Sequence, residues 1–300
     1  MIKKYSRDMV GYGQKTPKVK WPNNAKLALQ IVLNYEEGSE NCVLHGDRTS
    51  EVFLSEIIGA QPVKGRHINM ESLYEYGSRR GFWRIHKLFQ EKKIPITIFG
   101  VGMALEKNLE ICQAIKESDY EVASHGWRWI DYQKVSRSTE KKHMQLAIKS
   151  IEKIFGKRPL GWYTGRCSPN TRDLVMEEGG FLYDSDSYSD DLPYWEIRGK
   201  KRQLIIPYTL DNNDMRFATN QGFNSGEQFY TYLKDSFDAL YNEDSPPKMM
   251  SVGLHCRIIG RPGRIQSLKK FLDYVLKHKD VWICKRIDIA KHWIKNYSIK

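Results

Sequence analysis

Two adjacent glutamates and two distant histidines are the residues whose types and positions first suggest a catalytic site. Glu36 and Glu37 follow one apolar run, and His125 and His255 each follow another. A carboxylate can act as a general base toward water, and a histidine can protonate a departing nitrogen. Adjacent side chains at a strand end point to opposite faces, so one glutamate is expected to face a pocket. The sequence leaves open which of the two glutamates is the base. The alternative is that both are solvated side chains in a turn.

The residues after His125 differ from a common metal-binding pattern. Two histidines four positions apart place two ligands on one face, but Trp129 occupies the second position here. Because an indole does not ligate metals, we expect His125 to form hydrogen bonds in a polar pocket, with a purely structural role as the alternative. We expect Trp129 to form part of the pocket wall or of the core.

A loop with an arginine supplies a third candidate group. Arg166 lies between Gly165 and Pro169, after another short apolar segment. A guanidinium group in this position can bind a carboxylate or stabilise an oxyanion, a role that His125 could also fill. Asp184 and Asp186 could orient Arg166 or cap the next turn, and an ion pair that only anchors the loop is the alternative for Arg166.

The elements that must position these residues alternate between short apolar runs and segments of helical periodicity. Strands are predicted at residues 27–34, 96–101, 121–124, 160–163, 181–184, 204–208, 249–254 and 281–284. Helices are predicted at about 71–92, 105–116, 144–155, 170–179, 225–240 and 265–276, and from 288 onward. This alternation predicts an α/β fold, a (β/α) barrel in a single catalytic domain over residues 1–300. Chemistry in such barrels lies at the carboxyl ends of the strands, where these candidate residues fall.

Composition excludes several classes of protein. The 300 residues are 40% hydrophobic, and the net charge of +12 is spread without a dense basic segment, so no nucleic-acid partner is expected. No run approaches the ~18 apolar residues of a membrane helix, and no secretory signal is evident. Five cysteines without a Cys-x-x-Cys pair indicate reduced thiols, which favours a cytoplasmic protein. No phosphate-binding glycine loop or Gly-x-Ser-x-Gly motif is present.

These residues, in this order, resemble the polysaccharide deacetylase (NodB-homology) superfamily. That superfamily has a strand-end Asp-Asp motif, a His-x-x-x-His motif, an arginine loop, a later aspartate and a Leu-x-His-type motif. The counterparts in this sequence are Glu36–Glu37, His125 with Trp129, Arg166, Asp184 and Leu254–His255. In the metal-dependent members the second aspartate and both histidines bind the metal. Glu37 and Trp129 replace two of these three ligands, so the resemblance implies no metal site.

Longer phrases resemble one branch of that superfamily, the metal-independent allantoinases of urate catabolism. They are residues 34–47, 124–129, 161–166 and 211–217. This resemblance implies a deformed (β/α) barrel of about seven strands, a homotetramer, and hydrolysis of the allantoin ring amide to allantoate without a cofactor. The partner is then a small ureide.

The resemblance and the residues together assign expected roles. Glu36, His125 and His255 are expected to be catalytic; the expected substrate-binding residues are Glu37, Trp129, Arg166, Asp184, Asn212 and Asn213. One alternative is a metal-dependent deacetylase of N-acetylated sugars that uses His125 and one glutamate as a reduced ligand set. A binding protein that has lost catalysis is a third class.

Overall fold

The strands form a mostly parallel half-barrel. The computed structural model describes residues 7–243 and 245–299, and within them the sheet has the order β6-β7-β5-β4-β3-β2-β1-β8, with β9 pairing β1 beside this path. Among the strands of these residues, only β6 and β7 pair antiparallel. The strands are β1 (Leu27–Tyr35), β2 (Thr97–Gly100), β3 (Glu121–Ser124), β4 (Gly161–Trp162), β5 (Tyr183–Asp184), β6 (Tyr194–Arg198), β7 (Lys201–Ile205), β8 (Lys248–His255) and β9 (Val281–Cys284). The expected deformed (β/α) barrel is confirmed.

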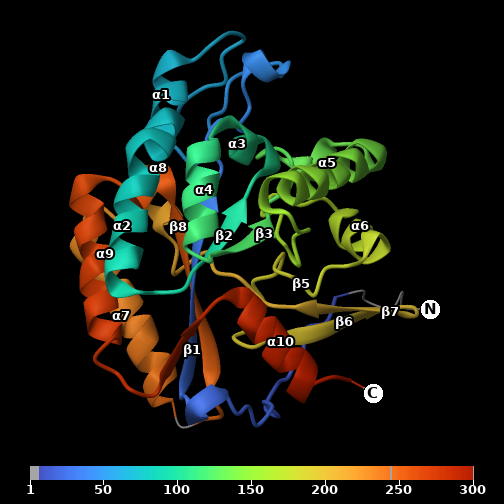
Figure 1. Ribbon diagram of the computed structural model, residues 1–300, viewed down its shortest axis with the longest axis vertical. Helices are drawn as coiled ribbons and strands as arrows, with labels where there is room; N and C mark the ends of the chain where they lie inside the picture. The colour runs from blue at the N-terminus through green and yellow to red at the C-terminus, as the bar shows by residue number, and fades with distance from the viewer. Residues whose placement is uncertain (1–6, 244, 300) are drawn as a thin grey trace.

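Helices cover the outer face of this sheet. Figure 1 shows α2, α7 and α9 along one side of the strands and α5 with α6 on the other. The helices are α1 (Ile68–Tyr76), α2 (Phe82–Lys92), α3 (Gly102–Lys107), α4 (Leu109–Glu117), α5 (Arg137–Phe155), α6 (Thr171–Glu178), α7 (Gly226–Asn242), α8 (Cys256–Ile259), α9 (Pro262–Val275) and α10 (Arg286–Asn296). No helix among the described residues is long and apolar enough to span a membrane.

The alternation of side chains along β1 separates the helix-facing layer from the interior of the half-barrel. All nine residues of β1 are buried. Its odd-numbered residues, Leu27 to Tyr35, pack in the cluster that includes α2, α7 and α9. Ala28 and Val32 belong to the second cluster, with Phe99 and Trp293, inside the half-barrel. This period of two determines which of the two glutamates after β1 faces inward.

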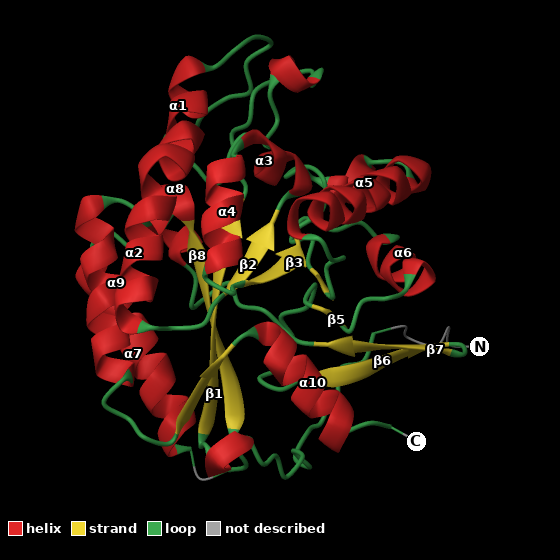
Figure 2. Ribbon diagram, viewed as in Figure 1, coloured by secondary structure: helices red, strands yellow, loops and turns green. Residues whose placement is uncertain are grey.

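Local sequence signals explain most boundaries, but some of the expected elements differ from the observed ones. Ser136 caps α5, which ends at Gly156 in the left-handed conformation. The helix expected at 105–116 is divided, because the Asn108 side chain accepts a hydrogen bond from Ile111 N and starts α4 there. Strand β6 was not expected, and β7 spans residues 201–205 rather than 204–208. These two strands form a hairpin at the edge of the sheet (Figure 2). Its side chains are partly exposed and lack a continuous apolar run.

A buried arginine at the start of α10 holds the interior of the half-barrel together. Arg286 is fully buried and donates hydrogen bonds to Gln30 Oε1 (2.6 Å), Ser251 Oγ (3.0 Å), Ser185 Oγ (3.0 Å from Nη2) and Pro207 O (2.9 Å). These partners come from β1, β8 and the segments after β5 and β7. One side chain therefore connects four parts of the half-barrel.

We expect Arg286→Met to lower the free energy of unfolding strongly. The substitution leaves several buried polar groups without a partner, each at a cost of about 1–3 kcal/mol, so a loss of roughly 3 kcal/mol or more is expected. Urea unfolding measures it, with the exposed Lys291→Met on the same helix as the control. Equal stability of both variants would show that Arg286 does not hold the half-barrel together.

Candidate active site

The strand register brings Glu36, His125 and His255 to one level at the carboxyl end of the sheet. Tyr35 pairs with Gly100, and Gly100 with Ser124, so Glu36 and His125 each follow an aligned residue. On the other side of β1, Asn34 pairs with His255. Residues that are more than 200 positions apart in sequence thus become neighbours, as the parallel sheet requires.

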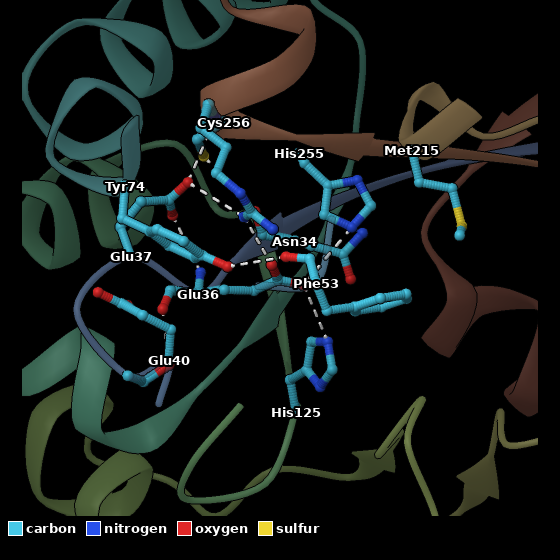
Figure 3. A network of polar contacts seen from close by, with 12 residues as sticks. Asn34, Glu36, Glu37, Glu40, Phe53, Tyr74, His125, Met215, His255 and Cys256 are labelled. Atoms are coloured by element: carbon cyan, nitrogen blue, oxygen red, sulfur yellow. Dashed lines mark hydrogen bonds and ion pairs between the residues drawn. The ribbon is translucent and has the colours of Figure 1, made fainter. Parts of the chain in front are cut away.

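Glu36 is the centre of this cluster. Its Oε1 lies 3.3 Å from His125 Nε2 and 3.5 Å from His255 Nε2 (Figure 3). Its Oε2 accepts a hydrogen bond from Arg257 Nη1 at 2.7 Å. Burial alone would raise the pKa of this carboxyl, but Arg257, His255 and His125 outweigh burial and hold the pKa well below its usual range. Glu36 is therefore a carboxylate at neutral pH.

Glu37 points away from the histidines, toward the helices. It continues the outward series of β1, and its carboxylate accepts hydrogen bonds from Glu36 N (3.0 Å) and Arg257 N (3.2 Å). The chain just after α1 can approach Glu37 this closely only because residue 77 is a glycine. A Cβ at Gly77 would lie 2.2 Å from Glu37 Oε1. Burial raises the pKa of Glu37 to about 7; neighbouring Glu36 adds to this rise and Arg257 opposes it.

His255 is oriented by an aspartate that sequence reasoning gave no role. Asp214 Oδ1 lies 2.6 Å from His255 Nδ1, and its Oδ2 accepts hydrogen bonds from His255 N and Ile259 N. With Nδ1 held by Asp214, Nε2 faces Glu36. Burial lowers the pKa of His255, but Glu36 and Asp214 outweigh it and raise the pKa above its ordinary value. The protonated form is thus favoured.

His125 lies against an aromatic wall. Its ring centroid is 4.9 Å from that of Tyr163 and 6.1 Å from that of Phe99. Tyr208, next to both aromatic rings, accepts a hydrogen bond from Asn34. His125 Nδ1 is buried and has no hydrogen-bond partner. This ring nitrogen is therefore available to a bound molecule.

Trp129 and Arg166 lie at the edge of the cluster rather than in contact with Glu36. Trp129 is buried and stacks on Phe53, with ring centroids 5.8 Å apart. The Arg166 guanidinium lies 5.0 Å from the Phe53 ring centre and 5.1 Å from that of Trp129, and its Nη1 is 3.4 Å from Glu51 Oε2. Arg166 thus holds the segment around Phe53 against Trp129.

Asp184 and Asp186 do not orient Arg166; the alternative of capping the next turn holds, because Asp184 Oδ1 accepts a hydrogen bond from Asp186 N at 2.8 Å. Asp184 pairs with Arg172 Nη1 at 2.7 Å, and Asp186 accepts backbone hydrogen bonds from Thr164 and Gly165. The cause is the loop after β4, which directs Arg166 toward Glu51 instead. Burial raises the pKa of Asp184 to about 7, although Arg172 opposes the rise.

The two asparagines lie beside β8, the strand that ends at His255. Asn212 O accepts a hydrogen bond from Gly253 N, and Asn213 packs against Gly253, where a Cβ would lie 2.2 Å from Asn213 Nδ2. Asn213 Oδ1 accepts a hydrogen bond from Met215 N and helps position the turn with Asp214. Asn212 Oδ1 is buried without a partner. Of the two, Asn212 has the free acceptor for a ligand.

The cluster is closed to solvent. Glu36, His125 and His255 are 1%, 3% and 5% exposed. A pocket of about 270 Å³ adjoins it on the Glu37 side, with Glu40, Tyr74 and Lys107 among its lining residues. The catalytic candidates themselves are thus almost inaccessible to solvent, and Glu37 is the residue through which the pocket adjoins them.

The residues of the cluster do not fit a metal ion. The described part of the chain brings together no group of three or more histidine, cysteine, aspartate or glutamate side chains that could hold one. Trp129 offers no ligand atom, and the guanidinium of Arg257 already neutralises Glu36. Glu37 faces the helices and hydrogen-bonds to the backbone.

Sequence comparison places the chain in a known family. The polysaccharide deacetylase family model matches residues 67–177. A Schizosaccharomyces pombe (strain 972) protein, whose name assigns it to the polysaccharide deacetylases, is 42% identical over 98% of this chain and 99% of its own length. The chain belongs to the polysaccharide deacetylase family. It is accordingly a hydrolase of that family.

Two solved structures of this family are similar along the whole chain. A Pseudomonas aeruginosa PAO1 protein that bears the name of a polysaccharide deacetylase is 56% identical, with a TM-score of 0.97 over 99% of this chain and all of its own. The structure of PuuE allantoinase is 54% identical, with a TM-score of 0.96 over 99% of both chains. The names of these two relatives point to different substrates.

Proposed function

We propose that this member of the polysaccharide deacetylase family is an allantoinase that hydrolyses the ring amide of allantoin to allantoate without a metal. The observation that carries the proposal is the enclosed cluster in which Glu36 lies between His125 and His255 and is neutralised by Arg257. A buried polar cluster of this kind suits a small ureide. The similarity to PuuE allantoinase supports the same choice.

The proposed reaction begins with a water molecule next to Glu36. Glu36 takes a proton from the water while its oxygen adds to the ring carbonyl carbon, and the carbonyl electron pair moves onto oxygen. The ring C–N bond then breaks as the carbonyl re-forms, and His255 gives its proton to the departing nitrogen. His125 and Asn212, each with a free buried polar atom, orient the ureide.

The geometry also allows the site to return to its starting state. After bond cleavage Glu36 carries a proton and His255 lacks one, and their Oε1 and Nε2 atoms are 3.5 Å apart. Transfer of that proton restores the carboxylate and the imidazolium. The new carboxylic acid of allantoate loses its own proton to solvent, so one proton is released in each turnover.

A comparison of substrates tests the proposal. Purified protein is incubated in parallel with allantoin and with an acetylated chito-oligosaccharide, and allantoate and acetate are measured. We expect allantoate alone. Release of acetate without allantoate would make the protein a deacetylase of N-acetylated sugars. Tight binding of allantoin without turnover would make it a binding protein.

The pH dependence of this reaction follows from the two opposite pKa shifts. Because the pKa of Glu36 is depressed and that of His255 is raised above 6.5, both required forms coexist near neutral pH. Activity then falls as pH rises through the pKa of His255. We expect Asp214→Asn to move this alkaline limb to lower pH, since Asp214 is one cause of the raised pKa. Profiles of kcat against pH measure it, with Asp211→Asn as the control; an unmoved limb would contradict the role of His255 as acid.

We also propose the cytoplasm as the compartment and a homotetramer as the assembly. The five cysteines are free, as expected of thiols in a reducing compartment. The homotetramer rests on the resemblance to the allantoinase branch. Analytical ultracentrifugation tests it, and a monomer at micromolar concentration would contradict it.

A further inference from the structure

Arg257 is a buried cation whose hydrogen-bonding capacity is only partly used. It lies two residues after His255, in α8, and is 3% exposed. Its Nη1 donates to Glu36 Oε2, but its Nε and Nη2 are buried and have no hydrogen-bond partner. Buried donors of a guanidinium rarely remain unpaired, because the loss of hydration is uncompensated.

The surroundings of Arg257 leave only the edge of its guanidinium free. The guanidinium carbon lies 4.3 Å from the centre of the Tyr74 ring and 5.0 Å from that of Trp129, as in cation–π contacts. The backbone N of Arg257 donates to Glu37 Oε1, which fixes the start of the side chain. Two rings and two carboxylates therefore hold the group rigidly beside Glu36.

A hydrogen-bond acceptor that enters with the substrate fits these two donors. Arginine donates from two adjacent nitrogens in a fixed fork, which matches an oxygen that carries negative charge. Such an oxygen forms when water, activated by Glu36, adds to a carbonyl. Preorganised donors beside that oxygen stabilise the transition state without reorganisation.

We propose that Arg257 is a catalytic residue whose Nε and Nη2 bind the carbonyl oxygen of the scissile amide and stabilise the oxyanion. This inference rests on the proposed amide hydrolysis. As water loses its proton to Glu36 and its oxygen bonds to the carbonyl carbon, the carbonyl electron pair moves onto the oxygen that faces Arg257. When the C–N bond breaks, that pair re-forms the carbonyl, and His255 supplies the proton to nitrogen.

The contact between Arg257 and Glu36 couples proton transfer from water to the formation of the oxyanion. In the resting site the guanidinium stabilises the ionised form of Glu36 and makes it a weak base. As the oxyanion forms, part of that attraction is directed to the new negative charge. Glu36 then gains basicity at the moment when it must hold the proton of water. Arg166 does not offer this coupling, because it pairs with Glu51.

Chemical rescue tests the proposal. Arg257→Ala and Arg257→Lys are assayed with allantoin, with and without millimolar guanidinium chloride, and folding is followed by circular dichroism. The control is Arg261→Ala, because Arg261 also stacks on a tyrosine, Tyr76 at 3.7 Å, but pairs with Glu56 outside the cluster. We expect Arg257→Ala to lower kcat by about 10²–10³-fold, the typical effect of losing an oxyanion donor. KM should change far less, and guanidinium should restore part of kcat.

The outcomes separate this inference from the proposed function. If wild-type protein does not hydrolyse allantoin, the proposed function fails and this inference fails with it. If wild-type protein is active and Arg257→Ala keeps its kcat, or loses it without any rescue, only the role of Arg257 is overturned. If Arg257→Ala does not fold, Arg257→Lys keeps the positive charge beside Glu36 but lacks the planar fork. A folded Arg257→Lys protein with wild-type kcat would then overturn the proposal.

Discussion

Glu36→Gln should lower kcat for allantoin by about 10²–10⁴-fold, the contribution that a general base typically makes. The amide keeps the size of the side chain but cannot accept a proton from water. It also removes the negative charge between His125, His255 and Arg257, so three neighbouring cationic or protonatable groups lose their common partner. Steady-state kinetics with allantoin measures the loss. Circular dichroism verifies that the variant is folded.

Glu37→Gln is the matched control, because Glu37 is adjacent, buried and of the same type. Burial raises the pKa of its carboxyl to about 7, so it is partly protonated at neutral pH already, and an amide oxygen can keep one of its two backbone hydrogen bonds. We expect a loss of less than about tenfold in kcat, equivalent to about 1.4 kcal/mol of barrier. A larger loss for Glu37→Gln than for Glu36→Gln would identify Glu37 as the base.

His255→Gln should also lower kcat by about 10²–10⁴-fold, because the departing nitrogen would have no proton donor. Glutamine retains a polar side chain but cannot carry the mobile proton that Asp214 and Glu36 stabilise on His255. The alkaline limb of the pH profile should disappear with it. Rates at several pH values measure both effects.

The control for His255→Gln is His292→Gln, since His292 is a partly exposed histidine of α10 outside the cluster. A general acid matters less when the leaving nitrogen is less basic. An allantoin analogue with an electron-withdrawing group on that nitrogen should therefore lose less activity in His255→Gln. If both substrates lose the same factor, His255 orients the substrate and does not protonate it.

The sequence was sufficient for the fold because its signals are local. Apolar runs that alternate with helical periodicity marked most strands, and the polar residues after those runs marked the end of the half-barrel that holds the cluster. The short helix α8 was not predicted, and among the strands of the described residues only β6 was missed entirely. Its residues, Tyr194–Arg198, are partly exposed at the edge of the sheet and lack the apolar pattern of a buried strand.

The choice between the two glutamates needed the three-dimensional arrangement, although a signal was present. Gln30 and Asn34 share the even parity of Glu36, and a polar residue within an apolar strand marks the face that turns inward. That parity assigns Glu36 to the cluster and Glu37 to the helices. The residues between Gln30 and Asn34 are all apolar, so the sequence of β1 does not show a simple alternation of polar and apolar residues.

The contacts of Arg257 and Asp214 could not be derived from the sequence. Arg257 follows His255 by two positions, but only the turn into α8 directs its guanidinium to Glu36. Asp214 contacts His255, which lies 41 positions later in the sequence, because Asn213 packs against Gly253 of β8. Arg172, in the first turn of α6, pairs with Asp184, whereas Arg166, in the loop after β4, pairs with Glu51.

The requirement for metal tests the central claim most directly. Protein is treated with a chelator, its metal content is verified by elemental analysis, and allantoate release is followed before and after zinc is added. Because Arg257 neutralises Glu36 and Trp129 offers no ligand, we expect the full rate without metal and no stimulation by zinc. Allantoate that forms only after stoichiometric zinc is restored would contradict the account.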